Sequence, residues 1–293
     1  MNQIILMIIG AVVFLIAAPF LGGILSGIDR KLTAKMQSRR GPPVLQPFYD
    51  VAKLWHKEKV FANPVEKIFT ISYLVFIALS GALLFGGFNI LLIVFCLALA
   101  HTFIILAAYA ANAPYSHIGA ERELLSVMVA EPVLILIGAG LFMVTGTFMV
   151  SEIFFASGLP AICYLPGVFV ALIAVLTLKL RKSPFDISTS HHAHQELVKG
   201  VTSSFAGKTL AKVEIAHWYE TVIFLGLIVL FFGGYPVLGI IVAIAAFILE
   251  IVIDNVFPRV TWQMTVKSLW LITLILGVIN IIVIGILSAG GML

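Results

Sequence analysis

Eight apolar stretches constrain the fold of this chain more than any other feature of its sequence. They lie at approximately 4–28, 68–87, 89–111, 122–148, 160–180, 217–234, 236–254 and 267–289. A helix needs about 20 predominantly apolar residues to cross the hydrocarbon core of a bilayer. Only 11% of the residues are charged, against about 25% in soluble domains. The sequence therefore predicts an all-α integral membrane protein with eight transmembrane helices in a single domain, 1–293.

The basic residues indicate how these spans are oriented. With eight spans, all 18 Lys and Arg residues fall in connections on one side of the membrane. The positive-inside rule makes that side cytoplasmic and places both termini outside. Two of the cytoplasmic connections, about 29–67 and about 181–216, are long and polar. Because connections of this length are often functional, we expect the two loops to form a docking surface for a soluble partner.

The first loop contains a predicted amphipathic helix. The turn Gly41-Pro42-Pro43 breaks any helix before it. Phe48, Val51, Ala52 and Trp55 then follow the i, i+3, i+4, i+7 spacing of one helical face over about three turns. Such a helix can lie in the headgroup layer, with its lysines near anionic lipid. Alternatively, it helps to shape the mouth of a partner's site.

The connection before the fourth span carries acids that lead into the membrane. Glu121 and Glu123 are expected in a first helical turn, where the helix dipole favours carboxylates. Glu131 lies about 15 Å deeper, where a charged acid costs at least about 3 kcal/mol. We expect Glu131 to face the bundle interior and, with Glu123, to begin a carboxylate chain. The alternative is a lone protonated acid bonded to a neighbouring helix, and for His101 in the third span a neutral, satisfied histidine is expected.

The second loop and the helix after it hold the densest group of ionisable residues. These residues are Asp186, His191, His192, His194, Glu196, Glu214, His217 and Glu220. The three loop histidines are one and two residues apart, so regular structure places them on different faces, and a metal site is not expected. The i, i+3, i+6 spacing of the last three residues instead offers a polar route from the loop into the membrane. For Glu250 and Asp254, near the end of the seventh span, a simple snorkelling helix end is expected.

The two cysteines, Cys96 and Cys163, stand singly in apolar surroundings. No CxxC spacing is present, so this chain by itself is not expected to hold an iron–sulfur cluster or any other cofactor.

Three polar regions resemble one family of membrane subunits. The matching runs are QSRRGP at 37–42, LQP at 45–47, DVAKL at 50–54, AERELL at 120–125, EP at 131–132, RKSPFD at 181–186 and ELVKG at 196–200. They are similar to the eight-span junction subunit of respiratory complex I, which is shared with membrane-bound energy-converting [NiFe] hydrogenases. Between 186 and 196 the chain carries histidines where the complex I branch is strongly acidic. This difference resembles the Ech-type hydrogenase branch.

The resemblance implies a role and a set of partners. The chain would be the membrane anchor and ion-translocation subunit of a ferredoxin-linked hydrogenase in a prokaryotic cell membrane, coupling hydrogen turnover to H⁺ or Na⁺ movement. Hydrogenase large and small subunits and a ferredoxin-like cluster subunit would hold the [NiFe] centre and the [4Fe-4S] clusters. An antiporter-like membrane subunit would lie beside it, and no nucleic acid is expected to bind.

Two groups of residues follow as candidates. The expected ion path comprises Glu121, Glu123, Glu131, Glu196, Glu214 and Glu220. The expected partner-docking residues are Arg39, Arg40, Asp50, Lys53, Arg181, Asp186, His191, His192 and His194. In the expected mechanism, a charge change in the partner shifts the pKa values of the acids near the loop, and protonation passes inward to Glu123, Glu131 and the next membrane subunit.

Three other functions fit parts of the sequence. A quinone-reducing subunit of the complex I type would bind a quinone. A stand-alone secondary transporter would bind its own substrate, although the chain has no internal repeat of the kind many transporters show. A passive anchor would tolerate every acid-to-amide change.

Overall fold

The computed structural model describes residues 2–58, 63–156, 158–182, 184–185, 188 and 199–289. Regular structure within these ranges is helical, without β-strands. The elements in chain order are α1 (Asn2–Met36), α2 (Gln46–His56), α3 (Pro64–Phe85), α4 (Ile90–Ala110), α5 (Pro114–Thr145), α6 (Val150–Phe154), η1 (Ala161–Cys163), α7 (Pro166–Lys179), η2 (Gly200–Thr202), α8 (Lys208–Leu230), α9 (Pro236–Val256), α10 (Trp262–Ile272), η3 (Thr273–Val278) and α11 (Ile279–Ala289).

The described helices form an integral membrane protein. Seven helical segments in the described ranges are long and apolar enough to cross a bilayer, if α10, η3 and α11 are taken as one segment. The predicted span at 160–180 differs from the rest, because it forms the 3-10 turn η1 followed by α7 of only 14 residues. At 1.5 Å per residue α7 is about 21 Å long, less than the hydrocarbon thickness of about 30 Å. Pro166, at the first position of α7, fixes where this helix begins.

Two helices start earlier than the apolar stretches suggested. α5 begins at Pro114, about two turns before the predicted span at 122, and α8 begins at Lys208 instead of 217. Polar residues therefore extend these helices beyond the apolar segment. One consequence corrects an expectation, because no acid lies in the first turn of α5. Glu121 and Glu123 lie further along the helix, outside the region where its dipole acts most strongly.

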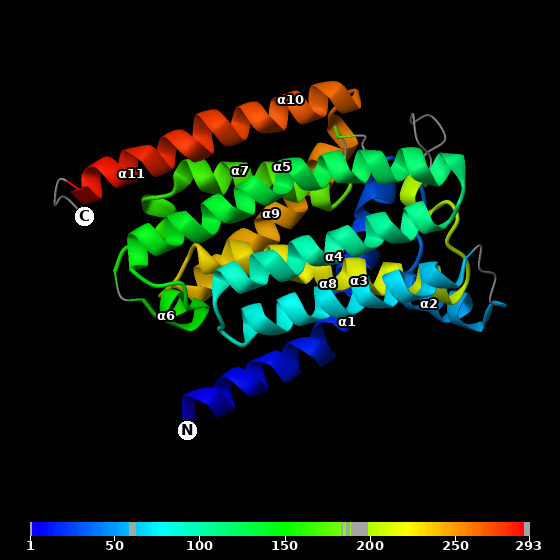
Figure 1. Ribbon diagram of the computed structural model, residues 1–293, viewed down its shortest axis with the longest axis horizontal. Coiled ribbons are helices and arrows are strands. Elements are labelled where there is room, and N and C mark those ends of the chain that lie inside the picture. The colour runs from blue at the N-terminus through cyan, green and yellow to red at the C-terminus, as the bar shows by residue number, and fades with distance from the viewer. Residues whose placement is uncertain are drawn as a thin grey trace.

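The helices run mainly along the long axis of the molecule, and both termini lie at the end that carries α6 (Figure 1). α2 and the starts of α5 and α8 lie at the other end, which we call the basic end because it carries Arg30, Lys182 and Arg259. α8 is the central helix, with 61% of its most apolar stretch buried. The corresponding value is only 11% for α1 and 17% for the α10–α11 segment. These two peripheral segments expose apolar side chains to their surroundings.

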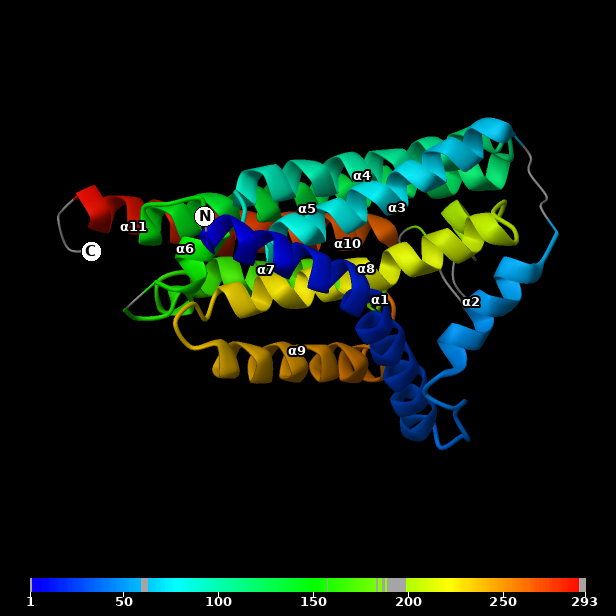
Figure 2. The same cartoon turned by 90° about the horizontal axis from the view of Figure 1, so that it is seen from below.

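α1 is bent in its middle, and its second half leaves the long axis of the bundle (Figure 2). Pro19 lies inside this helix and removes one backbone hydrogen bond, which explains the bend. Three glycines then let other segments approach α1 closely. A side chain at Gly22 would overlap the Trp218 backbone, one at Gly23 the Phe48 ring, and one at Gly27 the Val44 carbonyl. The second half of α1 is therefore the seat of α8 and of the first loop.

The amphipathic helix predicted in the first loop is confirmed as α2, which spans 11 residues. Phe48 packs against Trp218 of α8, with ring centroids 5.2 Å apart. Trp55 lies under the ammonium group of Lys208, 6.0 Å from its ring centroid. The apolar face of α2 is thus directed at least partly onto α8, where it forms one wall of the basic end.

Candidate functional site

The candidate site begins at the helical face that the spacing on α8 predicted. Glu214, His217 and Glu220 all line one cavity of about 450 Å³ at the basic end. The opposite walls come from α1, from the segment after α7, and from the end of α9. Glu220 lies deepest of the three, because only 5% of it is exposed. The helical route that the sequence indicated therefore runs along the wall of this cavity.

Glu220 is part of a buried triad drawn from three helices. Its Oε1 lies 2.7 Å from Nε2 of His101 on α4 and 3.9 Å from Nζ of Lys179 on α7. The same His101 nitrogen lies 2.9 Å from Lys179 Nζ. Each of the three side chains is at most 6% exposed. Burial of these charges is sustainable because each one lies beside an oppositely charged or hydrogen-bonding group.

The triad has more contacts than its protons can satisfy at once. His101 Nε2 offers either one N–H or one lone pair. With an N–H it donates to the Glu220 carboxylate, and Lys179 then cannot use this nitrogen. With a lone pair it accepts from Lys179, and Glu220 then loses its donor. The two hydrogen-bonding arrangements are mutually exclusive, so a small change in the local field can move a proton between them.

A second layer of polar groups extends the triad towards α3. His217 Nδ1 lies 3.2 Å from Glu220 Oε2 and 3.4 Å from the hydroxyl of Tyr73. His217 Nε2 is buried and has no hydrogen-bond partner among the described residues. Tyr73 is only 1% exposed. The two carboxylate oxygens of Glu220 therefore contact two different histidines, one on α4 and one on α8.

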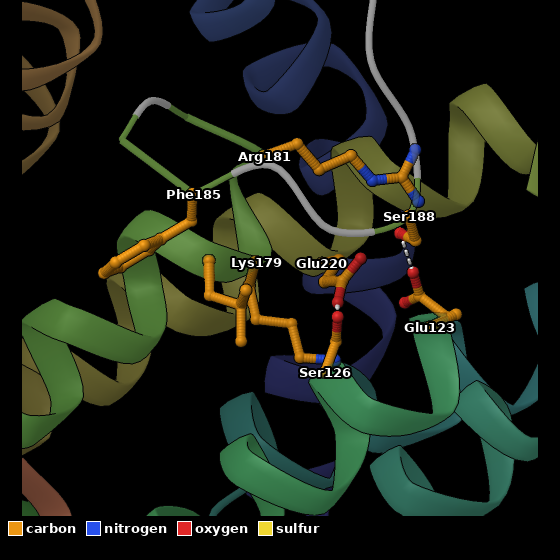
Figure 3. A pocket seen from close by; sticks show the side chains of 8 residues that line it. Glu123, Ser126, Lys179, Arg181, Phe185, Ser188 and Glu220 are labelled. Carbon is orange, nitrogen blue, oxygen red and sulfur yellow. Dashed lines mark hydrogen bonds and ion pairs between the residues drawn. The ribbon is translucent and has the colours of Figure 1, made fainter. Parts of the chain in front are cut away.

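A second, smaller cavity connects Glu220 with Glu123 (Figure 3). Its volume is about 20 Å³, enough for about one water molecule. Glu123 is 7% exposed and accepts a hydrogen bond from Ser188. Arg181 lines both this cavity and the larger one. Its backbone has a φ of 56°, an unusual conformation for a residue other than glycine, and it turns the chain just after α7.

The rim of the large cavity is held by ion pairs between distant segments. Lys182 Nζ lies 2.6 Å from both carboxylate oxygens of Asp29 on α1 and 3.3 Å from Asp254 on α9. Arg30 contacts Asp50 of α2 at 2.6 Å. Partial burial raises the pKa of Asp50, but hydrogen bonds from Arg30 and Gln46 and nearby positive charge outweigh it, so this pKa is lowered. These contacts fix the ends of α1, α2 and α9 around the opening.

The structure brings some of the predicted path residues together and separates others. Glu123 and Glu220 share the small cavity, and Glu214 and Glu220 share the large one. Glu121 is exposed on the outer face of α5. Glu131 is half-buried, at the edge of an exposed strip that includes Met128 and Ile135, and it lines neither cavity. Its neighbours on this chain are therefore those of a bundle surface more than of an interior.

The docking candidates divide in the same way. Arg39, Arg40 and Lys53 are exposed at the basic end, and Arg39 also lines the large cavity. Asp50 and Arg181 are half-buried and occupy its rim and its interior, as described above. The remaining candidates lie outside the described residues: Asp186, His191, His192, His194 and Glu196.

Sequence reasoning missed three buried ionisable groups. Lys179 was expected only as a positive helix end, although it is 9% exposed and contacts the triad. Glu66, in the first turn of α3, is fully buried, and neither of its oxygens has a hydrogen-bond partner among the described residues. Glu250 is also fully buried, so the expected snorkelling helix end is wrong. Its position four residues before Asp254, further into an apolar run, was the available signal.

Comparisons with known proteins agree with this arrangement. A family model described as NADH dehydrogenase matches residues 6–285. Hydrogenase-4 component C of Escherichia coli is 28% identical over 71% of this chain and 67% of its own length. A membrane subunit of the NADH-quinone oxidoreductase of Aquifex aeolicus is 29% identical over 73% of each chain. Formate hydrogenlyase subunit 4 of Escherichia coli is 24% identical over 87% of this chain and 93% of its own length.

A solved structure has the same fold. It is a chain of the membrane-bound sulfane sulfur reductase, an archaeal respiratory membrane complex, with a TM-score of 0.84 and 26% identity. The match covers 95% of this chain and 99% of that one. Relatives with these names are subunits of hydrogenase and respiratory membrane complexes, and the resemblance drawn from the polar segments is confirmed.

Proposed function

Because the chain belongs to the NADH dehydrogenase family and is a membrane subunit of a hydrogenase- or complex I-like assembly, we propose that it couples redox chemistry in a soluble partner to ion movement. In this proposal the complex is a ferredoxin-linked energy-converting [NiFe] hydrogenase that moves H⁺ or Na⁺. The relatives named hydrogenase-4 component C and formate hydrogenlyase subunit 4 support this branch. The nickel–iron centre and the [4Fe-4S] clusters belong to the partner subunits.

The observation that carries the proposal is the triad of Glu220, His101 and Lys179. Three ionisable side chains inside a membrane bundle are costly and are commonly functional. They lie at the inner end of a cavity that opens at the basic end, where a soluble partner would dock. A charge change in that partner acts on the triad through a region of low dielectric, where electrostatic effects are strong. The field then selects which of the two hydrogen-bonding arrangements is occupied.

The route away from the triad follows the small cavity. A proton released near Glu220 reaches Glu123 through one water molecule in the 20 Å³ space that both residues line. Glu131 lies two turns further along α5, on a half-exposed strip. We propose that an antiporter-like membrane subunit covers this strip and accepts the proton from Glu131. Glu131 is then the exit from this chain, which accounts for its position at the bundle surface.

The proposed topology has eight crossings, with η1 and α7 together forming the fifth. The basic end faces the cytoplasm, and both termini lie on the other side of a prokaryotic cell membrane. The short length of α7 is then made up by η1 and by α6, which lie at its far end. Hydrogenase large and small subunits and a ferredoxin-like cluster subunit occupy the surface formed by Arg39, Arg40 and Lys53.

The proposal is tested by separating transport from redox activity. In membrane vesicles, Glu220→Gln is expected to lower turnover-driven ion uptake at least about tenfold, because the triad loses its titratable acid. Dye-linked hydrogenase activity of the soluble module should remain at the wild-type level. Glu121→Gln serves as the matched control, since Glu121 is an exposed acid outside both cavities. Undiminished ion uptake in Glu220→Gln would contradict the proposal.

The large cavity supports a second candidate, a quinone-reducing subunit. A volume of about 450 Å³ with Trp218 and Phe247 in its wall is within the usual range for small-molecule sites. The similarity to the NADH-quinone oxidoreductase of Aquifex aeolicus adds to this interpretation. Solvent extraction of the complex that co-purifies with the tagged chain, together with metal analysis, distinguishes the two. Nickel without quinone selects the hydrogenase, and bound quinone without nickel selects the alternative.

A further inference from the structure

Glu250 on α9 is a buried acid that the route above does not use. It is fully buried, and α9 is one of the helices long and apolar enough to cross the membrane. Its Oε1 lies 3.0 Å from Oγ1 of Thr177 on α7. Its Oε2 is buried and has no hydrogen-bond partner among the residues the structure describes. An ionised carboxylate in this position would keep one oxygen without compensation in a region of low dielectric.

The contacts of Thr177 indicate the protonation state of Glu250. The Thr177 hydroxyl lies 3.1 Å from the carbonyl oxygen of Ile173 as well as 3.0 Å from Glu250 Oε1. A hydroxyl carries a single hydrogen and can also accept. If that hydrogen points at the Ile173 carbonyl, which can only accept, the contact with Glu250 requires a proton on the acid. A neutral Glu250 that donates to Thr177 satisfies both contacts, whereas an ionised one must share a single hydrogen with the carbonyl.

The charged groups around Glu250 connect it with the large cavity. Asp254 lies one turn further along the same face of α9 and lines that cavity. Lys182 faces this region from the segment after α7, Asp29 faces it from α1, and Arg259 lies beyond α9. Lys182 already contacts Asp29 and Asp254 within 3.3 Å. Its ammonium group is therefore held by two other carboxylates, which leaves the Thr177 hydroxyl as the polar partner of Glu250.

We propose that Glu250 is a proton-storage site, a carboxylic acid kept neutral inside the membrane that donates to Thr177 and exchanges its proton with the large cavity by way of Asp254. In the exchange, Glu250 gives its proton to the Asp254 carboxylate, which releases it to water in the cavity. The reverse steps reload the acid. This site rests on the proposed function and deepens it, because it would place a second store of protons across the cavity from Glu220.

Infrared spectroscopy of the purified complex tests this proposal directly. Exchange from H₂O into D₂O shifts the C=O stretching band of a protonated carboxyl, and ionised carboxylates give no such band. We expect one shifting band to disappear in Glu250→Gln, to change frequency in Thr177→Val, and to persist in the control Glu121→Gln. Because a glutamine amide can still donate to Thr177, Glu250→Gln should assemble as well as the wild type.

The exchange route has its own outcome. Asp254→Asn is expected to slow deuterium exchange of the Glu250 band at least about fivefold, since the relay carboxylate is gone. Loss of no band in Glu250→Gln would mean that the acid is ionised and would overturn the proposal. An unchanged exchange time in Asp254→Asn would overturn the route. Both measurements are independent of ion transport, so failure of the proposed coupling function would be recognised separately.

Discussion

The hydroxyl of Tyr219 donates a hydrogen bond of 2.7 Å to the carbonyl oxygen of Leu15. In a regular helix this carbonyl would accept from the amide of residue 19. Residue 19 is a proline inside α1 and has no amide hydrogen. Tyr219 on α8 therefore supplies the donor that Pro19 removed, and a bent helix is stabilised in a setting where water cannot substitute.

A double-mutant cycle tests this substitution. Tyr219→Phe should lower the free energy of unfolding by about 1 kcal/mol, because one buried carbonyl loses its donor. In a Pro19→Ala background the alanine amide can serve the same carbonyl, so Tyr219→Phe should then have a much smaller effect. Thermal unfolding in detergent gives both values. Equal losses in the two backgrounds would show that the hydroxyl stabilises something else.

The start of the short helix α7 depends on a side chain from α11. Asn280 Oδ1 accepts from the amides of Gly167 and Val168 at 2.9 and 3.3 Å, and its Nδ2 donates to the Tyr164 carbonyl at 3.0 Å. Asn280→Ala is expected to destabilise the protein by about 1–3 kcal/mol, because buried backbone groups lose their partners. The control Ser268→Ala removes only a bond within its own helix. Similar thermal shifts for the two variants would refute this role of Asn280.

The close approach of the first loop to α1 requires Gly27. A methyl group there would overlap the Val44 carbonyl, which is backbone and cannot rotate away. We expect Gly27→Ala to displace the loop at 41–45 and to reduce the amount of partner complex that co-purifies. Gly138→Ala is the matched control, because a methyl group there meets only side chains, the nearest at 3.3 Å. If Gly27→Ala retains the full complement of partners, the loop does not need this contact.

The Arg30–Asp50 pair gives a pH-dependent prediction. The pKa of Asp50 is lowered in the folded protein by the contacts of its carboxylate. Its stabilisation is therefore complete above the unfolded pKa of about 4 and is lost as the pH falls through the lower folded value. Both side chains are more than 40% exposed, so Asp50→Asn should cost at most about 1 kcal/mol near pH 7.

Thermal unfolding of wild type and Asp50→Asn across this pH range tests the assignment. The stability difference should shrink towards zero near about pH 3. It should also shrink at high salt, which screens exposed pairs. A difference that is unchanged at low pH would indicate that Asp50 acts through packing instead of charge.

Much of the architecture follows from patterns that the sequence displays openly. Apolar runs predicted the long helices, and the spacing of Phe48, Val51 and Trp55 predicted α2. The face formed by Glu214, His217 and Glu220 was predicted correctly because a helix fixes which residues share a side. Helix starts at Pro114 and Lys208 were missed, since polar residues can continue a helix past the apolar segment without changing its hydrophobic signal.

The triad was only partly accessible from the sequence. His101, Lys179 and Glu220 come from three helices, and one sequence alone does not reveal which helices pack together. A histidine in an apolar run is usually a satisfied core residue, and a lysine at the end of one is usually an anchor. Their joint role depends on distances of 2.7 and 2.9 Å that only tertiary packing determines. Glu250 was misjudged for the same reason, because its burial depends on the contact of α9 with α7.

The number of ions moved per electron pair, measured in proteoliposomes for a double-mutant cycle on His101 and Glu220, tests the account most directly. If the triad is one proton switch, Glu220→Gln and His101→Gln should each lower this ratio at least about tenfold, and the double variant should lower it no further. A wild-type ratio in Glu220→Gln, or losses that multiply in the double variant, would contradict the central claim.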